Sequence, residues 1–301
     1  MITNFDQVFE ELRSKSKKRM IAAWGVDDHT ITAASMAIEK GIVDVTLVGD
    51  KDMILAVCEK ENINPNIFTI IDNKDELKSI AQAVGMVKDG EGDILMKGLC
   101  STDKYMRGIL NKERGLLPPK AVLSHVAVVE NPNYHKLIVL GDMAVIPLPD
   151  FKQKIAITKY LVNTAKALGI AKPKVAAIAA TEQMLDGMTA CVEAALLAKM
   201  ADRGQIGGCY LDGPLALDVA INKEAASIKK LNSEVAGDAD CLMFPNIESA
   251  NVFYKVNSML CQNVRQAAIV AGAQAPCVLS SRADSIDTKL NSIALAALTA
   301  K

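Results

Sequence analysis

The first 90 residues alternate short apolar runs with longer amphipathic segments, and this alternation constrains the fold more than any other feature of the chain. The short runs have the length of buried strands and cover residues 20–25, 45–48 and 67–71. The longer segments have the start signals or the spacing of helices and cover residues 30–42, 50–60 and 75–89. In the last of these, Ile80, Val84 and Val87 recur at helical spacing. A β-α-β-α-β-α order predicts a largely parallel sheet with helices on both faces.

The rest of the chain continues this pattern. Further strands are expected at residues 93–96, 122–129, 137–140, 175–179, 208–211, 241–244, 267–272 and 276–281. Further helices are expected at residues 101–110, 151–168, 185–201, 215–228, 250–264 and 284–299. Two prolines and an aspartate in residues 147–150 supply a stop and a new helix cap, so we expect a domain boundary there. The chain should therefore fold into two α/β domains in direct contact, and small ligands usually bind in the cleft between such domains.

Composition excludes several classes of protein. A length of 301 residues suffices for two domains, and 50% apolar with 23% charged residues excludes a disordered polypeptide. The formal net charge of −1 supplies no field that would recruit nucleic acid. Every apolar run is broken before the ~20 residues that a membrane span needs. Because the N-terminus shows no secretory signal, we expect a cytoplasmic protein that has neither membrane nor nucleic acid as a partner.

The cysteines and acidic residues do not form a clear metal site. The seven cysteines are an odd number at wide spacing, without a C-x-x-C pair, so neither zinc nor disulfides are predicted. Most are expected to be buried small residues in a reducing compartment. A carboxylate site would pair Asp212 or Asp218 with Asp238 and Asp240, but the Gly-Pro turn after Asp212 offers an equally good structural explanation. We therefore predict no metal.

Polar residues at two strands are candidates for a binding site: Lys97, which follows the strand at 93–96, and Ser124, which lies inside another strand. After the strand at 93–96, the amides of a glycine-containing turn and the following helix dipole would suit an anion, with Lys97 and Arg107 near enough to neutralise it. An ordinary strand-to-helix turn with Ser101 as its cap explains the same residues and is favoured by the local pattern alone. Ser124, inside another apolar strand, is by the same standard more often a satisfied core group than a catalytic one.

A third polar group stands at the start of the last helix. The last expected strand delivers Ser281 and Arg282 to this helix start. Asp284, Asp287 and Thr288 follow at positions i, i+3 and i+4, which share one helix face. An arginine in the first turn matches the positive end of the helix dipole poorly, because that end prefers anions. Arg282 is therefore better explained as an anion-binding residue than as a helix stabiliser.

Six motifs, taken in order, resemble those of one enzyme family. They are Leu-Met-Lys-Gly (95–98), Leu-Ser-His-Val (123–126), Gly-Asp-Met-Ala (141–144), Asp-Gly-Pro-Leu-Ala-Leu-Asp (212–218), Val-Ala-Gly-Asp-Ala-Asp (235–240) and Ser-Arg-Ala-Asp-Ser (281–285). The chain is similar in these motifs to the phosphate acetyltransferase and phosphate butyryltransferase family, and the butyryl-transferring branch looks closest. The resemblance covers nearly the whole chain from Lys97 onward and is looser before it.

The resemblance implies an enzyme that exchanges acyl-CoA plus phosphate for acyl phosphate plus CoA. It implies two three-layer α/β domains like those of isocitrate and isopropylmalate dehydrogenases, with a cleft between them and the last segment returning to the first domain. The expected domains are therefore residues 1–148 with 272–301, and residues 149–271. It also implies a homo-oligomer, a dimer or a multiple of dimers. The acyl group should be short, with butyryl expected, and CoA is a substrate, with no tightly bound cofactor.

The resemblance also assigns site residues. Arg282 would grip phosphate with its two-pronged guanidinium, and Ser281 would donate to the oxyanion of the tetrahedral intermediate. Lys97, Arg107, Ser124 and Asn251 are the predicted substrate contacts, for phosphate or CoA. Transfer is expected by direct attack of the CoA thiol on the acyl phosphate in a ternary complex.

The base that accepts the thiol proton is less well defined. A thiol with a pKa near ~8.5 is only a few per cent ionised at neutral pH, so CoA needs a base or a cation that stabilises the thiolate. Acetyl-transferring members of the family place an aspartate seven residues after the serine, where this chain has Thr288. Asp287 is the predicted catalytic base. Asp284, one turn earlier, is the alternative, although its expected role is to cap the last helix.

Two other classes of function remain as alternatives. One is a nicotinamide- and metal-dependent dehydrogenase of the same fold, which ranks low because no clear G-x-G-x-x-G follows the first strand. The other is a non-catalytic protein that binds acyl-CoA or phosphate, although Ser281 and Arg282 are both present. Among the three, only the transferase would form thioester from CoA and acyl phosphate without nicotinamide or metal.

Overall fold

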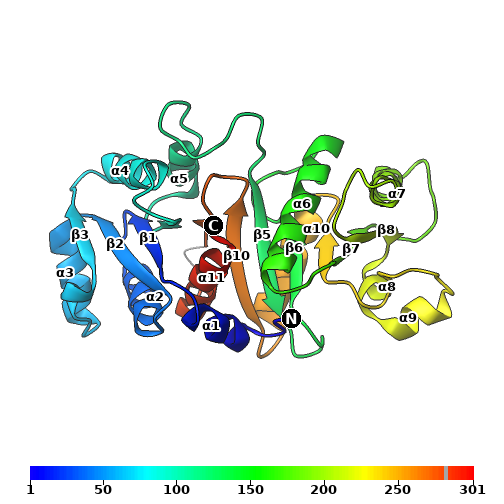
Figure 1. Ribbon diagram of the computed structural model, residues 1–301, viewed down its shortest axis with the longest axis horizontal. Helices are drawn as coiled ribbons and strands as arrows, with labels where there is room; N and C mark the ends of the chain where they lie inside the picture. The colour runs from blue at the N-terminus through cyan, green and yellow to red at the C-terminus, as the bar shows by residue number, and fades with distance from the viewer. Residues whose placement is uncertain (281–283) are drawn as a thin grey trace. The chain divides into compact units, whose positions relative to one another are not determined.

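The computed structural model describes residues 1–280 and 284–301. This chain forms two compact units (Figure 1). The first unit consists of Phe5–Leu123 and Arg265–Lys301, and the second of Met1–Asn4 and Ser124–Val264. The chain thus changes unit at residues 4/5, 123/124 and 264/265, whereas the domain boundaries suggested by the sequence lie at 148/149 and 271/272.

The first unit is an α/β layer structure. Its strands are β1 (Lys18–Ala23), β2 (Val43–Gly49), β3 (Thr69–Asp72), β4 (Ile94–Lys97), β10 (Arg265–Ala271) and β11 (Cys277–Val278). Its helices are α1 (Phe5–Arg13), α2 (Asp28–Glu39), α3 (Lys51–Lys60), the 3-10 turn η1 (Pro65–Ile67), α4 (Glu76–Lys88), α5 (Thr102–Ile109) and α11 (Ile286–Thr299). The strand order within this unit is β3-β2-β1-β4-β11-β10, and every neighbouring pair is parallel except β10 with β11. The predicted parallel sheet is confirmed.

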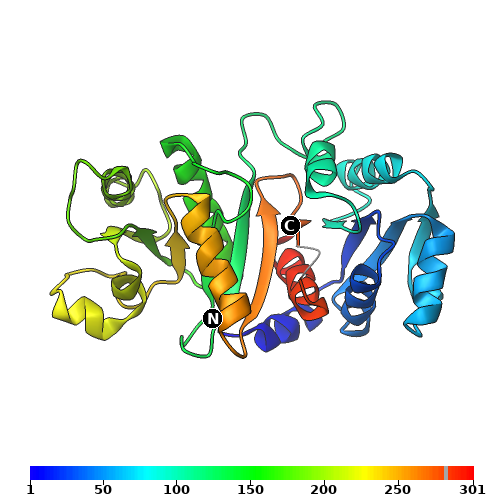
Figure 2. The ribbon, with the colours of Figure 1, turned by 180° about the vertical axis from the view of Figure 1, so that it is seen from behind.

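Helices cover both faces of this sheet. α2 and α3 lie on one face, and α4 packs against β1 and β2 on the other face, where it contacts α5 (Figures 1 and 2). α11 packs against α2 and β10, and ten consecutive residues of it, 289–298, are buried. Because β11 pairs with β4 in parallel, the C-terminal segment returns to the first unit.

The second unit contains the remaining elements. Its strands are β5 (Ser124–Glu130), β6 (Ile138–Gly141), β7 (Lys174–Ile178), β8 (Tyr210–Leu215) and β9 (Cys241–Met243). Its helices are α6 (Phe151–Ala167), α7 (Thr189–Asp202), α8 (Leu217–Ile221), α9 (Lys223–Ile228) and α10 (Ile247–Leu260). The strand order within the unit is β5-β6-β9-β7-β8, with β5 antiparallel to β6 and the other pairs parallel. This parallel majority agrees with the second α/β series expected from the sequence.

Most helix starts are explained by a capping side chain. The carboxylates of Asp27, Asp50, Asp75 and Asp150 accept backbone hydrogen bonds at the starts of α2, α3, α4 and α6. Ser101 does the same for α5, accepting from the Lys104 N–H at 3.2 Å. These residues satisfy N–H groups that have no partner inside the helix, which is why local sequence located the helix starts well.

Two helical segments differ from expectation. The helix expected at 215–228 is two helices, because Asn222 adopts an extended conformation and its side chain accepts from the Ala225 N–H at 3.0 Å, which starts α9. α1 was not predicted, although Phe5, Val8, Phe9 and Leu12 are all buried along one of its faces. Within residues 1–280 and 284–301, no helix combines the length and the apolar character needed to cross a membrane.

Candidate active site

Lys97 lies at the carboxyl end of β4, where ligands usually bind in parallel sheets. Its side chain is only 4% exposed, and its Nζ donates to the Gly98 carbonyl at 3.3 Å. The backbone turns tightly here, because a Cβ at Gly98 would fall 2.1 Å from the Trp24 carbonyl oxygen. The turn therefore holds a buried cation against the strand ends and leads directly into α5.

The start of α11 differs from the sequence-based expectation. Ser285 is the N-cap, and its Oγ accepts from the Thr288 N–H at 3.1 Å. The expected capping role of Asp284 is wrong, because Asp284 precedes this cap and the hydroxyl of Ser285 satisfies the free N–H of the first turn. Asp287 lies in the first turn with an exposed side chain. Ser281 and Arg282, the two firmest predictions, lie outside the described residues.

Lys289 is the site residue that sequence reasoning missed. It lies in α11 with a side chain 4% exposed, and its Nζ donates to the Ser280 Oγ at 3.0 Å. Burial lowers the pKa of Lys289, while the negative charges of Asp27 and Asp284 oppose that shift. The sequence does carry a signal, because Lys289 falls within a run of otherwise apolar or small polar residues that a helix would bury.

Lys97 and Lys289 line one small cavity of about 150 Å³. The other lining residues are Asp27, Asp28 and His29 from the start of α2, together with Gly98 and Leu99. The cavity thus brings together the end of β4, the start of α2 and α11. Its volume corresponds to several water molecules at ~30 Å³ each, which is enough for the end of a thiol or for part of a phosphate group.

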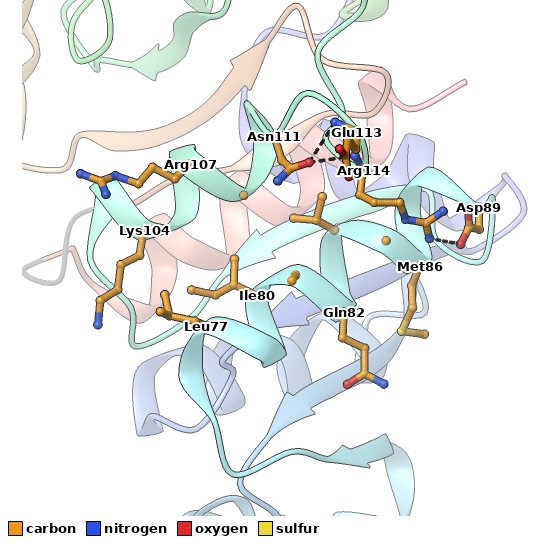
Figure 3. Close-up of a pocket in the computed structure, with 14 residues that line it drawn as sticks. Leu77, Ile80, Gln82, Met86, Asp89, Lys104, Arg107, Asn111, Glu113 and Arg114 are labelled. Carbon is orange, nitrogen blue, oxygen red and sulfur yellow. Dashed lines mark hydrogen bonds and ion pairs between the residues drawn. The ribbon is translucent and has the colours of Figure 1, made fainter.

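Arg107 lines a different cavity, between α4 and α5 (Figure 3). That cavity has a volume of about 650 Å³ and an apolar floor that includes Ile80 and Val84. In Figure 3, Arg107 extends away from Ile80, and its side chain, 79% exposed, pairs with Asp103 at 3.0 Å. The other two cations of this cavity are also paired, Lys104 with Glu76 and Arg114 with Asp89. The structure therefore places Arg107 and Lys97 in the same unit but in separate cavities.

Ser124 and Asn251 belong to the second unit. Ser124 begins β5 and is fully buried, and within the described chain its Oγ has no hydrogen-bond partner. A buried hydroxyl left without a partner costs ~1–3 kcal/mol, so an oxygen-rich ligand could satisfy it. Asn251, in α10, donates from Nδ2 to the Met143 carbonyl at 3.0 Å, which ties the helix to the loop after β6.

The side chain of Asp142 stabilises the loop after β6 through hydrogen bonds to its backbone. Its carboxylate accepts from the backbone N–H groups of Ala144 and Val145 at 2.8 and 2.9 Å, and from that of Ile146 at 3.2 Å. The Gly-Asp-Met-Ala motif therefore has a structural role that its sequence did not reveal, and it positions the carbonyl that Asn251 contacts.

A family model described as phosphate acetyl/butaryl transferase matches residues 4–82 and 75–297. The chain belongs to this family. The family expected from the sequence motifs is thereby confirmed, as is the expectation of an enzyme, since curated proteins similar to this chain are named as transferases.

Similar proteins extend over the whole chain. A phosphate butyryltransferase of Clostridium acetobutylicum is 43% identical over 300 residues, covering 100% of this chain and 99% of that protein. A branched-chain phosphotransacylase from Enterococcus faecalis V583 has a TM-score of 0.84 at 27% identity, covering 94% and 98% of the two chains. A 4-hydroxythreonine-4-phosphate dehydrogenase from Klebsiella pneumoniae shares the fold, with a TM-score of 0.60 at 10% identity over 95% and 100%. The predicted dehydrogenase-like α/β fold class of this transferase family is confirmed.

The acidic residues that a metal site would need are engaged otherwise in this family member. Asp238 pairs with Lys174 at 2.7 Å and Lys136 at 3.0 Å, and Asp240 pairs with Lys136 at 2.6 Å. Burial alone would raise the pKa of Asp238, but hydrogen bonds from Lys174 and Lys136 outweigh it and lower the pKa to about 2. Within the ranges 1–280 and 284–301, no group of three His, Cys, Asp or Glu side chains is arranged to hold a metal ion. The network instead joins β7 and β9 to the segment before β6.

Proposed function

We propose that this chain is a phosphate acyltransferase that exchanges a short acyl group, with butyryl the expected one, between CoA and phosphate. The observation that carries the proposal is the full-length similarity to a phosphate butyryltransferase. The similarity covers 100% of this chain and 99% of that protein, so it is not confined to one local pattern. CoA is a substrate in this proposal, with no tightly bound cofactor.

The described residues support a phosphate site at the end of β4. β11 pairs with β4 so that Val278 lies opposite Met96, which brings the chain at Ser280 close to Lys97. Ser281 and Arg282 follow Ser280 directly. We place the transferred phosphate here, with Arg282 as its two-pronged partner and Lys97 as a buried cation that acts at low dielectric. Ser281 would donate to the developing oxyanion.

We propose Ser124, Asn251 and Arg107 as the remaining substrate contacts. Ser124 supplies a buried hydroxyl that lacks a partner among the described residues, and Asn251 supplies an amide already engaged with the Met143 carbonyl. Arg107 is exposed and would contact an outer part of CoA, because CoA is large compared with the cavity of about 150 Å³ at Lys97. Asp287 remains the base predicted from the sequence.

Transfer would proceed by direct attack of the CoA thiol on the acyl phosphate in a ternary complex. An acylated cysteine would need a reactive thiolate, and burial works against one. Burial raises the pKa of Cys277 to about 12, and it raises the pKa values of Cys58, Cys100 and Cys209 as well. Such thiols are poor nucleophiles at neutral pH.

We also propose a homo-oligomer in the cytoplasm, a dimer or a multiple of dimers. The free cysteines of the chain, six of them buried, suit a reducing compartment.

The experiment is a direct assay of the purified protein. Butyryl phosphate and CoA are mixed with enzyme in the presence of a chelator and without nicotinamide, and thioester formation is followed by absorbance. We expect turnover, and a series from acetyl to hexanoyl phosphate should show a preference of ~10- to 200-fold per methylene at most. Binding without turnover would instead support a non-catalytic acyl-CoA or phosphate-binding protein, and a requirement for nicotinamide and metal would support a dehydrogenase.

A further inference from the structure

Lys289 is a buried amine whose polar partner in the described chain is a hydroxyl. Its Nζ donates to the Ser280 Oγ at 3.0 Å, and both side chains are 4% exposed. Within residues 1–280 and 284–301, no carboxylate lies within ion-pair distance of this Nζ. A structural buried lysine in this protein looks different, since Lys154 and Lys136 are paired with Glu193 and Asp240. Burying an amine without such a partner is costly, so a functional reason is worth seeking.

The position of Lys289 suits chemistry at the end of the sheet. It lines the cavity of about 150 Å³ together with Lys97, and it contacts the residue that directly precedes Ser281. Asp287 is two residues earlier in the same helix, a rotation of ~200°, and its side chain is exposed. The helix therefore turns Lys289 toward the cavity and Asp287 toward solvent. At the position where the resemblance to acetyl-transferring members implies an aspartate, Thr288 contacts the Ser285 Oγ at 3.1 Å.

We infer that Lys289 is the catalytic base of this enzyme and takes the proton of the CoA thiol. This inference rests on the proposed acyl transfer and replaces Asp287 in that role. The thiol proton moves to the neutral amine of Lys289, which becomes an ammonium ion, and the thiolate forms the new bond to the acyl carbonyl carbon. The carbonyl–oxygen bond to phosphate breaks, and the ammonium ion returns the proton to the departing phosphate. Atoms, protons and charge balance without an added reactant.

The charges around Lys289 are consistent with an amine that can lose its proton. The charged or titratable groups that line its cavity or act on its charge are Asp27, Asp28 and His29 at the start of α2, Lys97 of β4 and Asp284 before α11. On β10, which also packs against α11, Arg265 pairs with Asp6 of α1. Burial lowers the pKa of Lys289 despite Asp27 and Asp284, which brings the neutral amine closer to physiological pH. The neutral amine can then accept the proton of the thiol, and the positive charge of the neighbouring Lys97 stabilises the thiolate that forms.

The test compares Lys289→Met, Lys289→Arg and Asp287→Asn across a pH range, with the exposed Lys74→Met as the matched control. Removing a general base typically costs ~10²–10⁴ in rate. We expect Lys289→Met to lose at least about 100-fold in kcat near pH 7, with the loss shrinking as pH rises because the thiol of CoA then ionises without help. Lys289→Arg should not restore the rate, because arginine stays protonated. The control Lys74→Met should keep the wild-type rate and pH profile.

Two further measurements separate catalysis from folding. Methionine removes the cost of burying an amine, so the melting temperature of Lys289→Met should equal or exceed that of the wild type, whereas a structural lysine would show a lower one. In Lys289→Ala, added methylamine or ethylamine should restore part of the rate, in proportion to the concentration of free amine.

Several outcomes of these experiments would contradict the role of Lys289 as the base. A wild-type rate and pH profile in Lys289→Met overturn the inference, and so does full activity in Lys289→Arg, which would indicate only a cation. A pH-dependent loss in Asp287→Asn but not in Lys289→Met returns the role of base to the aspartate. If the wild-type protein itself forms no thioester from any acyl phosphate, the proposed function fails, and this inference fails with it.

Discussion

Lys136 Nζ lies 2.6 Å from Asp240 Oδ1, and both side chains are buried beside the start of β9. Asp238 extends the pair outward to Lys174, and Asp240 also accepts from the backbone N–H of Lys174 at 2.7 Å. Three segments far apart in the sequence are thus joined by one ionic network. Because removing one partner of a buried pair leaves the other charge uncompensated, this network should be more important for stability than an exposed salt bridge.

The first prediction concerns acid stability. The folded-state pKa of Asp238 is about 2, below its ordinary value of 3.8, so its ionised form stabilises the protein above pH 4. That contribution, on the order of 1–2 kcal/mol after solvent screening, should be lost as pH falls from about 4 to about 2. Asp238→Asn should lower the free energy of unfolding at pH 7 and flatten this acid loss, measured by urea denaturation at several pH values. The exposed Asp202→Asn serves as the control, and an equal effect there would contradict the prediction.

The second prediction concerns Arg282. Arg282→Ala should lose most of the turnover, about 100- to 1000-fold in kcat/KM, while the protein remains folded by circular dichroism. Arg282→Lys should recover only part of the rate, because a point charge cannot reproduce the two-pronged contact with phosphate. Near wild-type kinetics for both substrates in Arg282→Ala would exclude Arg282 from the site.

The third prediction is that no cysteine carries the acyl group. Initial rates measured over a grid of CoA and acyl phosphate concentrations should give the intersecting pattern of a ternary complex. The raised pKa values of Cys277, Cys100 and Cys58 oppose a covalent route, because the thiolate is the nucleophile. Mass spectrometry of rapidly quenched enzyme should show no acylated cysteine. An acyl adduct that forms and decays at the catalytic rate would contradict this prediction.

The fourth prediction distinguishes the two candidate caps of α11. Ser285→Ala should lower the free energy of unfolding by about 1 kcal/mol, because the Thr288 N–H loses its acceptor. For a domain of this size the melting temperature should fall by about 2–4 °C. Asp284→Asn should change the melting temperature much less, since Asp284 lies before the cap. The reverse order of the two variants would show that the hydroxyl of Ser285 is not the working cap.

Much of the architecture was predictable because its signals are local. The first six predicted elements correspond to β1, α2, β2, α3, β3 and α4, and aspartates such as Asp27 and Asp75 mark helix starts through hydrogen bonds to residues three positions ahead. Such contacts involve neighbours in the chain, so a single sequence contains both partners. The break at Asn222 was missed although its cap is also local, because the flanking residues continue a helical pattern.

The candidate site was less predictable from the sequence than the architecture. The sequence by itself determined the family and the alternating α/β order, and it predicted Lys97 at the end of a strand. Only the tertiary structure decided that Lys289 turns into the cavity of Lys97 while Asp287 faces solvent, that Arg107 lines a separate cavity, and that Asp238 and Asp240 are held by lysines. The reason is physical. A pattern of residues reveals periodicity and caps, whereas burial, cavity lining and ion pairing depend on which distant elements pack together, as β11 does when it carries the C-terminal segment to β4.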